Sequence, residues 1–258
     1  MKEPNEGVKS ARRVFEFLEY YAKVQRAVSV AELANHFGYP NSSVSSVMRT
    51  MVAMGYLSYN ATTRSYLPTA RLPFLNNWIG TRLFDHDRIW AMMLELSDAT
   101  GETILLGVQI GLRLQYTQVI DAKGPVRLHA ESGSFRGLTT TAAGLMLLSR
   151  FDDRTIGQLI RRINDEGEAE LINLPEVLQK IEAIRRDGHC VSIGGVVPGA
   201  GAIAMLLPKS VGETPLAIGV SSVESVIVQN RDAYIDLMKK VIKRHVNGDS
   251  EQRSRRAT

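Results

Sequence analysis

The stretch Ser29-Val30-Ala31-Glu32-Leu33-Ala34-Asn35-His36-Phe37-Gly38-Tyr39-Pro40-Asn41-Ser42-Ser43-Val44 decides how the first part of this 258-residue chain folds. Ser29, followed three residues later by Glu32, predicts a capping box in which each side chain accepts a hydrogen bond from an amide at the helix start. Gly38 predicts a left-handed end to that helix, and Asn41 or Ser42 is expected to cap the next one. The stretch therefore predicts two short helices joined by a tight turn.

Apolar residues recur at helical spacing on both sides of this turn. They are Val30, Leu33, Ala34 and Phe37 in the first helix, Val44, Val47, Met48, Met51 and Val52 in the second, and Val14, Phe17, Leu18 and Tyr21 in a helix upstream. Residues 56–59, a polar tip at 60–63 and residues 64–67 then predict a β-hairpin wing. Residues 1–72 are thus expected to form a winged helix-turn-helix that binds DNA. A protein-docking module built from the same elements is the alternative.

The outer face of the second helix is the surface expected to read bases. Its polar residues are Asn41, Ser42, Ser43, Ser45, Ser46 and Arg49. Serine hydroxyls form short, permissive hydrogen bonds with bases, whereas Arg49 can grip a guanine with two. Arg64, in the wing, suits a phosphate or minor-groove contact.

Positive charge is concentrated near the start of the chain. Residues 1–84 carry ten Lys or Arg against five Glu, whereas residues 85–248 carry eighteen Lys or Arg against twenty acidic residues. The excess fits neutralisation of DNA phosphates. Because the chain shows neither a leader pattern nor an apolar run of about 18 residues, we expect a cytoplasmic protein without a membrane partner. The single cysteine, Cys190, cannot form an internal disulfide and matches a reducing compartment.

Neither a cofactor nor catalysis is expected. The five histidines are His36, His86, His129, His189 and His245, and none is spaced with Cys190 as a metal ligand would be. Cys190 follows His189 and could be a reactive thiol, but neighbours on a strand point to opposite faces, which favours a buried, inert cysteine. The chain lacks a Gly-x-Ser-x-Gly elbow, a phosphate loop and a complete Gly-x-Gly-x-x-Gly motif, so an enzyme is not expected.

The rest of the chain predicts a second, α+β domain. A short helix over 73–84 leads to another helix from residue 85 that stops at Thr100-Gly101. Residues 103–110, 112–121 and 126–130 predict an antiparallel meander, followed by helices over 142–149, 155–163 and 175–187, strands over 202–207 and 216–221, and a last helix over 225–246. Such a sandwich is large enough to enclose a pocket. Residues 249–258 are predicted to be disordered, although their three arginines could instead touch DNA.

An ordered set of motifs along the chain resembles the IclR family of bacterial transcriptional regulators. The motifs are Ser10-Ala11-Arg12-Arg13-Val14, the helix-turn-helix from Leu33-Ala34 to Val44, Gly55-Tyr56-Leu57, Thr63-Arg64, Thr100-Gly101-Glu102-Thr103, Thr139 to Leu148, and Asp187-Gly188-His189. They follow the family's order over nearly the whole chain. Each motif alone is common, but the ordered set is specific.

The resemblance implies an N-terminal winged helix-turn-helix (1–72) joined by a linker helix (73–84) to a GAF-like antiparallel-sheet effector domain (85–248), in a homodimer or homotetramer. The effector domain would bind a small metabolite, often an organic or aromatic acid. Carried over to this chain, the pocket-lining residues would be Leu128, Ala142, Ala143, Ser192, Ala200, Ala202, Gly219 and Ser221. Thr140 and Thr141 join them because hydroxyls at a helix N-terminus suit an anionic group. The alternative is that Ala142, Ala143, Ala202 and Gly219 only allow close packing.

Two departures from the family pattern limit what the resemblance carries over. The family has an acidic residue where Ser192 stands, and here a glycine-rich loop follows it; basic residues of the family's recognition helix are replaced by Asn41 and Ser46. The effector's identity is therefore not transferable. The sequence predicts a ligand-responsive regulator, more often a repressor in this family, that binds a pseudo-palindromic operator in double-stranded DNA. A ligand-sensing scaffold that acts through a protein partner is the alternative.

Overall fold

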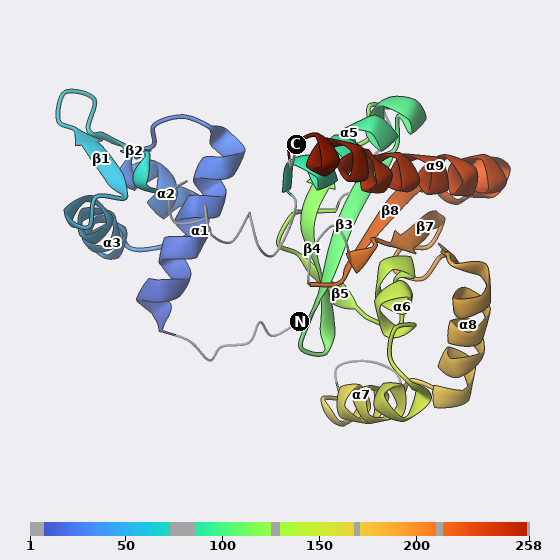
Figure 1. Ribbon diagram of the computed structural model, residues 1–258. Coiled ribbons are helices and arrows are strands. Elements are labelled where there is room, and N and C mark those ends of the chain that lie inside the picture. The colour runs from blue at the N-terminus through green and yellow to red at the C-terminus, as the bar shows by residue number, and fades with distance from the viewer. Residues whose placement is uncertain (1–7, 73–85, 125–129, 168–170, 210–213, 257–258) are drawn as a thin grey trace. The chain divides into compact units, whose positions relative to one another are not determined.

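The computed structural model describes residues 8–72, 86–124, 130–167, 171–209 and 214–256, with side chains up to Val246. The chain forms two compact units, residues 1–79 and 80–258, which Figure 1 shows as a small helical unit and a larger sheet unit. The boundary falls inside the expected linker 73–84. That predicted linker helix lies outside the described residues, and so do residue Leu128 and most of the predicted strand 126–130.

The first unit is the predicted winged helix-turn-helix. Its elements are α1 (Lys9–Val24), α2 (Val30–Phe37), α3 (Asn41–Ala53) and the antiparallel strands β1 (Leu57–Asn60) and β2 (Ser65–Pro68). The apolar stripes of the three helices meet in one core, whose buried members are Phe17, Tyr21, Val28, Leu33, Ala34, Val44, Val47, Met48, Met51, Leu57 and Tyr66. The helical spacing seen in the sequence therefore predicted the helical part of this core correctly, to which Val28, Leu57 and Tyr66 are added.

The capping prediction for α2 is half right. Ser29 Oγ accepts a hydrogen bond from the Glu32 amide at 3.2 Å, as expected, and Gly38 ends the helix at a φ of 67°. The Glu32 carboxylate does not return the bond to the Ser29 amide in the described contacts, because it accepts from Arg26 at 2.6 Å and from the Tyr20 hydroxyl at 2.8 Å. The hydrogen bond from Arg26 lowers the pKa of Glu32.

The predicted cap of α3 is wrong. The N-cap is Pro40, in extended conformation, and no side chain caps this helix; Asn41 and Ser42 already lie within its first turn. Proline fits this boundary because its fixed φ, here −60°, is compatible with the extended ψ of 134° and leaves its carbonyl free to accept from the helix. The Pro40 carbonyl accepts from the amides of Ser43 and Val44 at 3.0 and 3.2 Å.

The wing is tied to the helical core through the segment between α1 and α2. Val28 and Tyr66 exchange backbone hydrogen bonds of 3.0 and 2.8 Å, and the Tyr21 hydroxyl donates to the Tyr66 carbonyl at 3.1 Å. The tip is closed locally, because Asn60 Oδ1 accepts from the amides of Thr62 and Thr63. The wing and the helices therefore form one packed unit.

The second unit is built on a six-stranded antiparallel sheet in the order β5-β4-β3-β8-β7-β6. Its strands are β3 (Thr103–Ile110), β4 (Arg113–Ile120), β5 (Phe135–Gly137), β6 (Cys190–Ile193), β7 (Ala200–Leu206) and β8 (Leu216–Val223). The helices are α5 (His86–Thr100), α6 (Ala142–Leu148), α7 (Asp153–Asp165), α8 (Leu174–Asp187) and α9 (Glu224–Arg256). Figure 1 shows α5 and α9 over one face of this sheet and α6 and α8 at the other.

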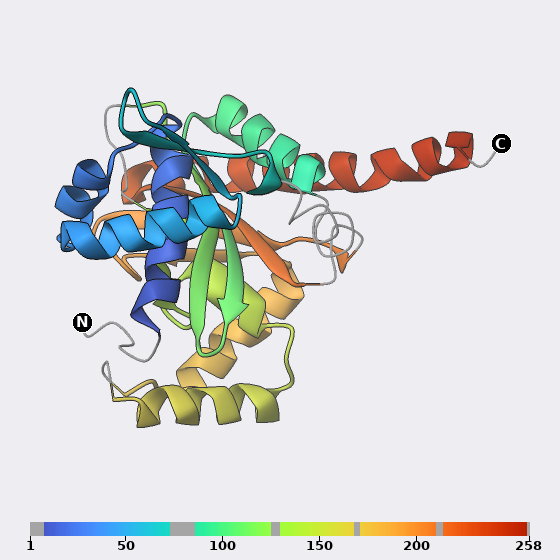
Figure 2. The same ribbon diagram turned by 90° about the vertical axis from the view of Figure 1, so that its left-hand side faces the viewer.

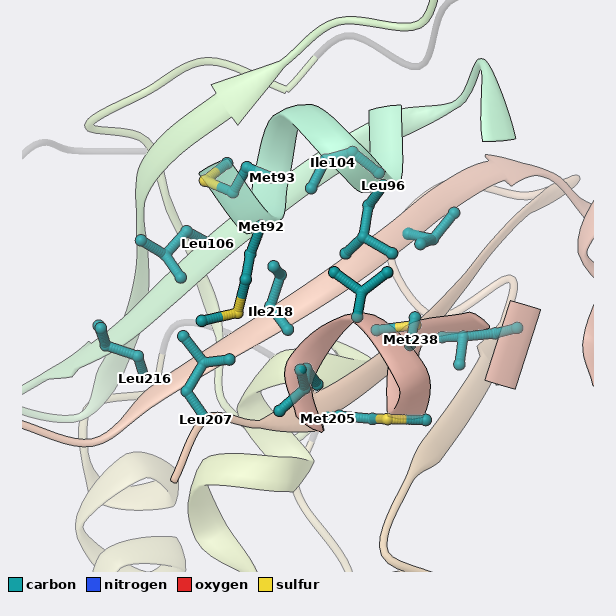
Figure 3. Close-up of a cluster of buried hydrophobic side chains, with 14 of the residues drawn as sticks. Met92, Met93, Leu96, Ile104, Leu106, Met205, Leu207, Leu216, Ile218 and Met238 are labelled. Atoms are coloured by element: carbon teal, nitrogen blue, oxygen red, sulfur yellow. The ribbon is translucent and has the colours of Figure 1, made fainter. Parts of the chain in front are cut away.

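Alternation along the strands fills a separate apolar cluster on each face. On β3, Ile104 and Leu106 point toward α5 and α9, whereas Leu105 points toward α6. Figure 3 shows the α5 side, where Met92 and Leu96 meet Ile218 of β8 and Met238 of α9. Both faces are covered, so the sheet is the middle layer of an α+β sandwich, as the sequence predicted.

Several element boundaries differ from the predictions. The strand β5 was not predicted, and β6 was assumed only in placing Cys190 on a strand of no stated bounds, since three or four residues are too few to show a clear alternation. The last helix, α9, runs to Arg256, so residues 249–256 are helical where disorder was predicted. Figure 2 shows the end of α9 continuing past the rest of its own domain. Among the described residues, no helix has both the length and the apolar character needed to span a membrane.

We expect Leu96→Ala to lower the free energy of unfolding by about 2–5 kcal/mol, because it removes a fully buried side chain and leaves a cavity. Urea denaturation followed by circular dichroism measures this change. The matched control is Leu94→Ala on the same helix, where the side chain is 41% exposed and the expected change is within about 0.5 kcal/mol. Equal losses in the two variants would contradict the placement of α5.

Candidate nucleic-acid interface and effector site

The polar face of α3 is exposed, as a base-reading surface requires. Asn41, Ser42, Ser46 and Arg49 are exposed, while Ser45 is half-buried. Opposite them, Val44, Val47, Met48 and Met51 are buried in the core, so the two faces of the helix are cleanly separated. Arg49 is the only charged side chain between Asn41 and Ala53. This face can form hydrogen bonds with base edges but contributes little charge.

Ser43 is engaged within the protein. Its hydroxyl oxygen accepts a hydrogen bond from Arg13 Nη1 of α1, and Ser43 is half-buried. Arg13 also lies over the ring of Tyr39, with its guanidinium carbon 4.5 Å from the ring centroid. Arg13 was not among the site residues expected from the sequence, because a contact between α1 and α3 has no signature in residue spacing.

The wing presents Arg64 at its tip. Arg64 is exposed and its φ is 50°, a left-handed conformation that side chains other than glycine seldom adopt. The neighbouring Thr63 and Ser65 hydroxyls share a hydrogen bond of 2.7 Å. The tip thus holds a cation on a closed turn, where it can reach a phosphate or a minor groove.

In the second unit, strand pairing gathers several expected effector residues on one face of the sheet. Ser192 of β6 pairs with Ala202 of β7, Ala202 pairs with Ser221 of β8, and Ser221 pairs with Thr103 of β3. Directly paired residues point to the same face, and Ala202 packs against the cluster on the α6 side. These four residues form a row, which we call the hydroxyl row. Thr103 was not expected from the sequence.

A glycine loop between β6 and β7 closes over this face. A Cβ atom on Gly195 would lie 2.2 Å from the Thr140 carbonyl oxygen and 2.7 Å from Ser192 Oγ. The loop is also tied at its base, where the Glu224 amide donates to the Gly199 carbonyl at 2.8 Å. The loop therefore connects the start of α6, the hydroxyl row and the start of α9.

Exposure separates the expected effector residues into two groups. Thr140 is exposed, and Ser192, Ala200, Ala202 and Ser221 are half-buried, so these five offer surface to a ligand. The others are buried: Thr141, Ala142, Ala143 and Gly219.

Close packing is the visible role of the buried group. The Thr141 hydroxyl is already used on both sides, because it accepts from the Gly144 amide at 3.0 Å and donates to the Gly137 carbonyl at 3.1 Å. A Cβ added to Gly219 would lie 3.2 Å from the Ile203 carbonyl oxygen. These residues hold α6 and neighbouring strands together.

The elements that carry and border the hydroxyl row have few ionisable side chains. The helix α6 and the loop 194–199 contain no Asp, Glu, Lys or Arg, and neither do β6, β7 and β8. Among the residues that the structure describes, no three His, Cys, Asp or Glu side chains lie close enough to hold a metal ion. The chemistry available here is hydrogen bonding by hydroxyls and apolar contact.

Family profiles match both structural units of the chain. The profile of the IclR helix-turn-helix domain matches residues 10–61, and that of the bacterial transcriptional regulator IclR C-terminal domain matches residues 87–244. The chain belongs to the IclR family of bacterial transcriptional regulators. It is therefore a DNA-binding regulator with an effector-binding C-terminal domain, and the resemblance seen in the sequence is confirmed.

Curated relatives of this IclR-family chain are regulators too. It is 25% identical over 193 residues to the HTH-type transcriptional regulator KdgR of Dickeya chrysanthemi, a match covering 73% of this chain and 62% of KdgR. The Escherichia coli K12 KdgR is 26% identical, with 73% and 72% covered. The HTH-type transcriptional repressor AllR of the same strain is 22% identical, with 87% and 84% covered. The Dickeya match thus spans just under two thirds of that relative.

Solved IclR structures share the architecture. The Thermotoga maritima IclR superposes with a TM-score of 0.65 at 18% identity, covering 93% of this chain and 98% of the other. The regulator from Alicyclobacillus acidocaldarius gives 0.63 at 20% identity, covering 94% and 98%. At these identities the likeness concerns the fold, which includes both the winged head and the sheet domain.

We expect Cys190 to be unreactive in the native IclR-family protein. It is 4% exposed, and burial raises the pKa of its thiol to about 12. Incubation with Ellman's reagent at pH 8 should give almost no release of thionitrobenzoate until urea is added, and then one equivalent. Rapid stoichiometric reaction without urea would contradict the buried position. A Cys190→Ser variant provides the zero-thiol baseline.

Proposed function

We propose that this chain is a ligand-responsive repressor that binds a pseudo-palindromic operator and is controlled by a small organic or aromatic acid. The proposal has one chief support, the presence in one chain of an exposed polar face on α3 and, in the effector domain, a hydroxyl row in which Ser192, Ala202 and Ser221 are half-buried. Repression is favoured by the relative AllR, which is named a repressor. The acting form is a homodimer, alone or paired into a homotetramer.

On the DNA side, α3 enters the major groove and the wing follows the backbone. Ser42, Ser45 and Ser46 form single hydrogen bonds with base edges, Asn41 bonds to a base edge through its amide, and Arg49 makes two bonds to a guanine. Arg64 contacts a phosphate or the minor groove. Two heads of a dimer read two half-sites about one helical turn apart.

On the effector side, the ligand lies against the hydroxyl row beneath the glycine loop. Thr140 and Ser192 supply hydroxyl groups for its polar end, and Ala200 and Ala202 supply apolar contact for its body. No carboxylate on these elements repels an anion.

Control is a shift between two arrangements of the paired heads. An effector can change operator affinity only by binding one arrangement more tightly than the other. A tenfold change in operator affinity requires about 1.4 kcal/mol of such preference. The glycine loop is where the ligand would exert it, since this loop touches both the site and the start of α9.

A salt titration tests the proposal against a ligand-sensing scaffold that acts through a protein partner. The scaffold is considered because the α3 face carries little charge. The probe is the duplex most enriched when the unmodified protein selects from a random library, here called the selected duplex. A regulator binds it with an affinity that falls steeply with salt concentration, whereas a scaffold enriches no duplex at all.

The effector itself is sought in a thermal-shift screen of small aromatic and aliphatic acids. A compound that binds the folded protein raises its melting temperature, by an amount that grows with the logarithm of its concentration relative to its Kd. Hits are then tested for an effect on binding of the selected duplex. A screen with no stabilising acid and with stabilisation by neutral compounds would overturn the assigned ligand class.

We expect Arg49→Ala to weaken binding of the selected duplex by about 1–3 kcal/mol and to relax the preference at one base pair, which is the usual contribution of a two-bond contact. Fluorescence anisotropy with a panel of single-base variants measures both effects. The control Lys239→Ala removes one exposed positive charge from α9 and should change neither. An equal loss on every duplex would mean that Arg49 touches only phosphate.

We expect Ser221→Phe to abolish the effector response while leaving DNA binding intact. Ser221 is half-buried in the hydroxyl row and its hydroxyl donates to the Gly201 carbonyl at 3.0 Å, so a phenyl ring there would fill the ligand's space. Calorimetry with an acid found by the screen measures the affinity. The matched control is Ser225→Phe at an exposed position of α9. Unchanged ligand affinity in Ser221→Phe would refute this location.

A further inference from the structure

We infer that Arg13 of α1 is a positioning residue for base recognition: it fixes the first turn of α3 through Ser43 and Tyr39, and Ser43 is its anchor and not a base-reading residue. This rests on the proposed base-reading role of α3 and goes beyond it, because it assigns specificity to a residue outside the helix-turn-helix and removes one residue from the reading surface.

The first observation is that α3 begins without a side-chain cap. Pro40 offers no side chain that could accept from the first amides, whereas Ser29 does so at the start of α2. A helix start without a cap is prone to fray, because several of its amides lack partners. The base-reading residues Asn41 and Ser42 lie in this very turn. Their direction must therefore be fixed by contacts from another element.

The second observation is that α1 supplies such contacts at two points. Tyr39, in the turn before α3, donates its hydroxyl to Glu16 Oε2 at 2.8 Å, and its ring stacks on Phe37 at 5.8 Å. Arg13, one turn before Glu16 on the same helix, covers the Tyr39 ring and donates to Ser43 Oγ. One guanidinium thus joins the turn to the third residue of α3.

The geometry requires an arginine. The flat guanidinium can lie on an aromatic face and, at the same time, direct an N–H group to an acceptor at its edge. A lysine has the same charge but only a compact ammonium group, which cannot hold both partners in this arrangement. These two contacts leave Arg13 half-buried, whereas an arginine that only contacts phosphate would be exposed in the free protein.

The engagement of Ser43 follows from the same contacts. A hydroxyl oxygen that accepts from a charged donor is held in one direction and is half-buried at the α1 side of α3. The reading surface then consists of Asn41, Ser42, Ser45, Ser46 and Arg49.

The test compares Arg13→Ala, Arg13→Lys, Ser43→Ala and the double variant Arg13→Ala with Ser43→Ala. Anisotropy titrations use the selected duplex and a scrambled duplex of the same length and composition, each at several salt concentrations. We expect every variant to lose about tenfold in affinity for the selected duplex, the usual scale for a hydrogen bond to a charged group. Affinity for the scrambled duplex and the salt dependence should stay unchanged. The double variant should be no weaker than the single ones, because both remove the same contact.

Three outcomes would overturn the inference. Equal losses on both duplexes, with a salt slope lower by about 0.9, would make Arg13 a phosphate contact. Additive losses in the double variant would make Ser43 an independent base contact. Full specificity in Arg13→Lys would mean that charge alone suffices.

Controls separate these outcomes from misfolding and from failure of the proposed function. Lys23→Ala removes the same charge from the other end of α1 and should leave the ratio of the two affinities unchanged. Circular dichroism shows whether each variant keeps the helical content of the unmodified protein. If the unmodified protein prefers no duplex, the proposed function fails; if it does and the Arg13 variants keep that preference, only the present inference fails.

Discussion

The alternation of side chains along β3, β7 and β8 is the constraint on which the sheet domain depends. Large aliphatic residues that point to one face of the sheet, such as Ile203 and Ile218, form a continuous core with α5 and α9. The residues that point to the other face include small ones, because α6 packs closely against that face. A Cβ on Gly107, for example, would contact the side chains of Leu114 and Ala143. Toward one end of this face the small residues are Ala202 on β7, Ser221 on β8 and Ser192 on the neighbouring β6, which are half-buried. One face thus stabilises the domain, while the end of the other carries the hydroxyls of the proposed effector site.

In the winged helix-turn-helix unit, residues close in sequence determine where each helix and strand begins and ends, and tertiary contacts orient these elements. Ser29 and Gly38 define the bounds of α2 through local hydrogen bonds: Ser29 accepts from the Glu32 amide, and the Gly38 amide donates to the Ala34 carbonyl. The helix α3 has an apolar face strong enough to form without a cap, but its first turn is positioned by side chains from α1. The wing, in turn, is fixed by backbone pairing between Val28 and Tyr66. Specificity in such a head is shared between residues that face the DNA and residues that hold them in place.

The winged head, the α+β sandwich and the family could all be predicted from the sequence, because helical and strand periodicities and cap residues act over short spacings. Strands as short as β5 and β6 could not, since their pairing is decided by partners distant in the chain. The contact between Arg13 and Ser43 spans thirty residues and leaves no pattern either. Among the expected effector residues, the sequence could not separate Thr141, whose hydroxyl caps its own helix, from Ser192, which keeps a half-buried position beside the loop. That distinction depends on which groups are already hydrogen-bonded in the folded chain.

The close approach of Gly195 to the Thr140 carbonyl limits how this domain can diverge. Any other amino acid places a Cβ atom 2.2 Å from that backbone oxygen, and backbone cannot rotate out of the way as a flexible side chain can. A relative with a side chain at the corresponding position must therefore hold its β6–β7 loop farther from α6. In the proposed effector site, the space between this loop and α6 would then be larger, and substitution of this one residue would change which ligands fit an otherwise shared scaffold.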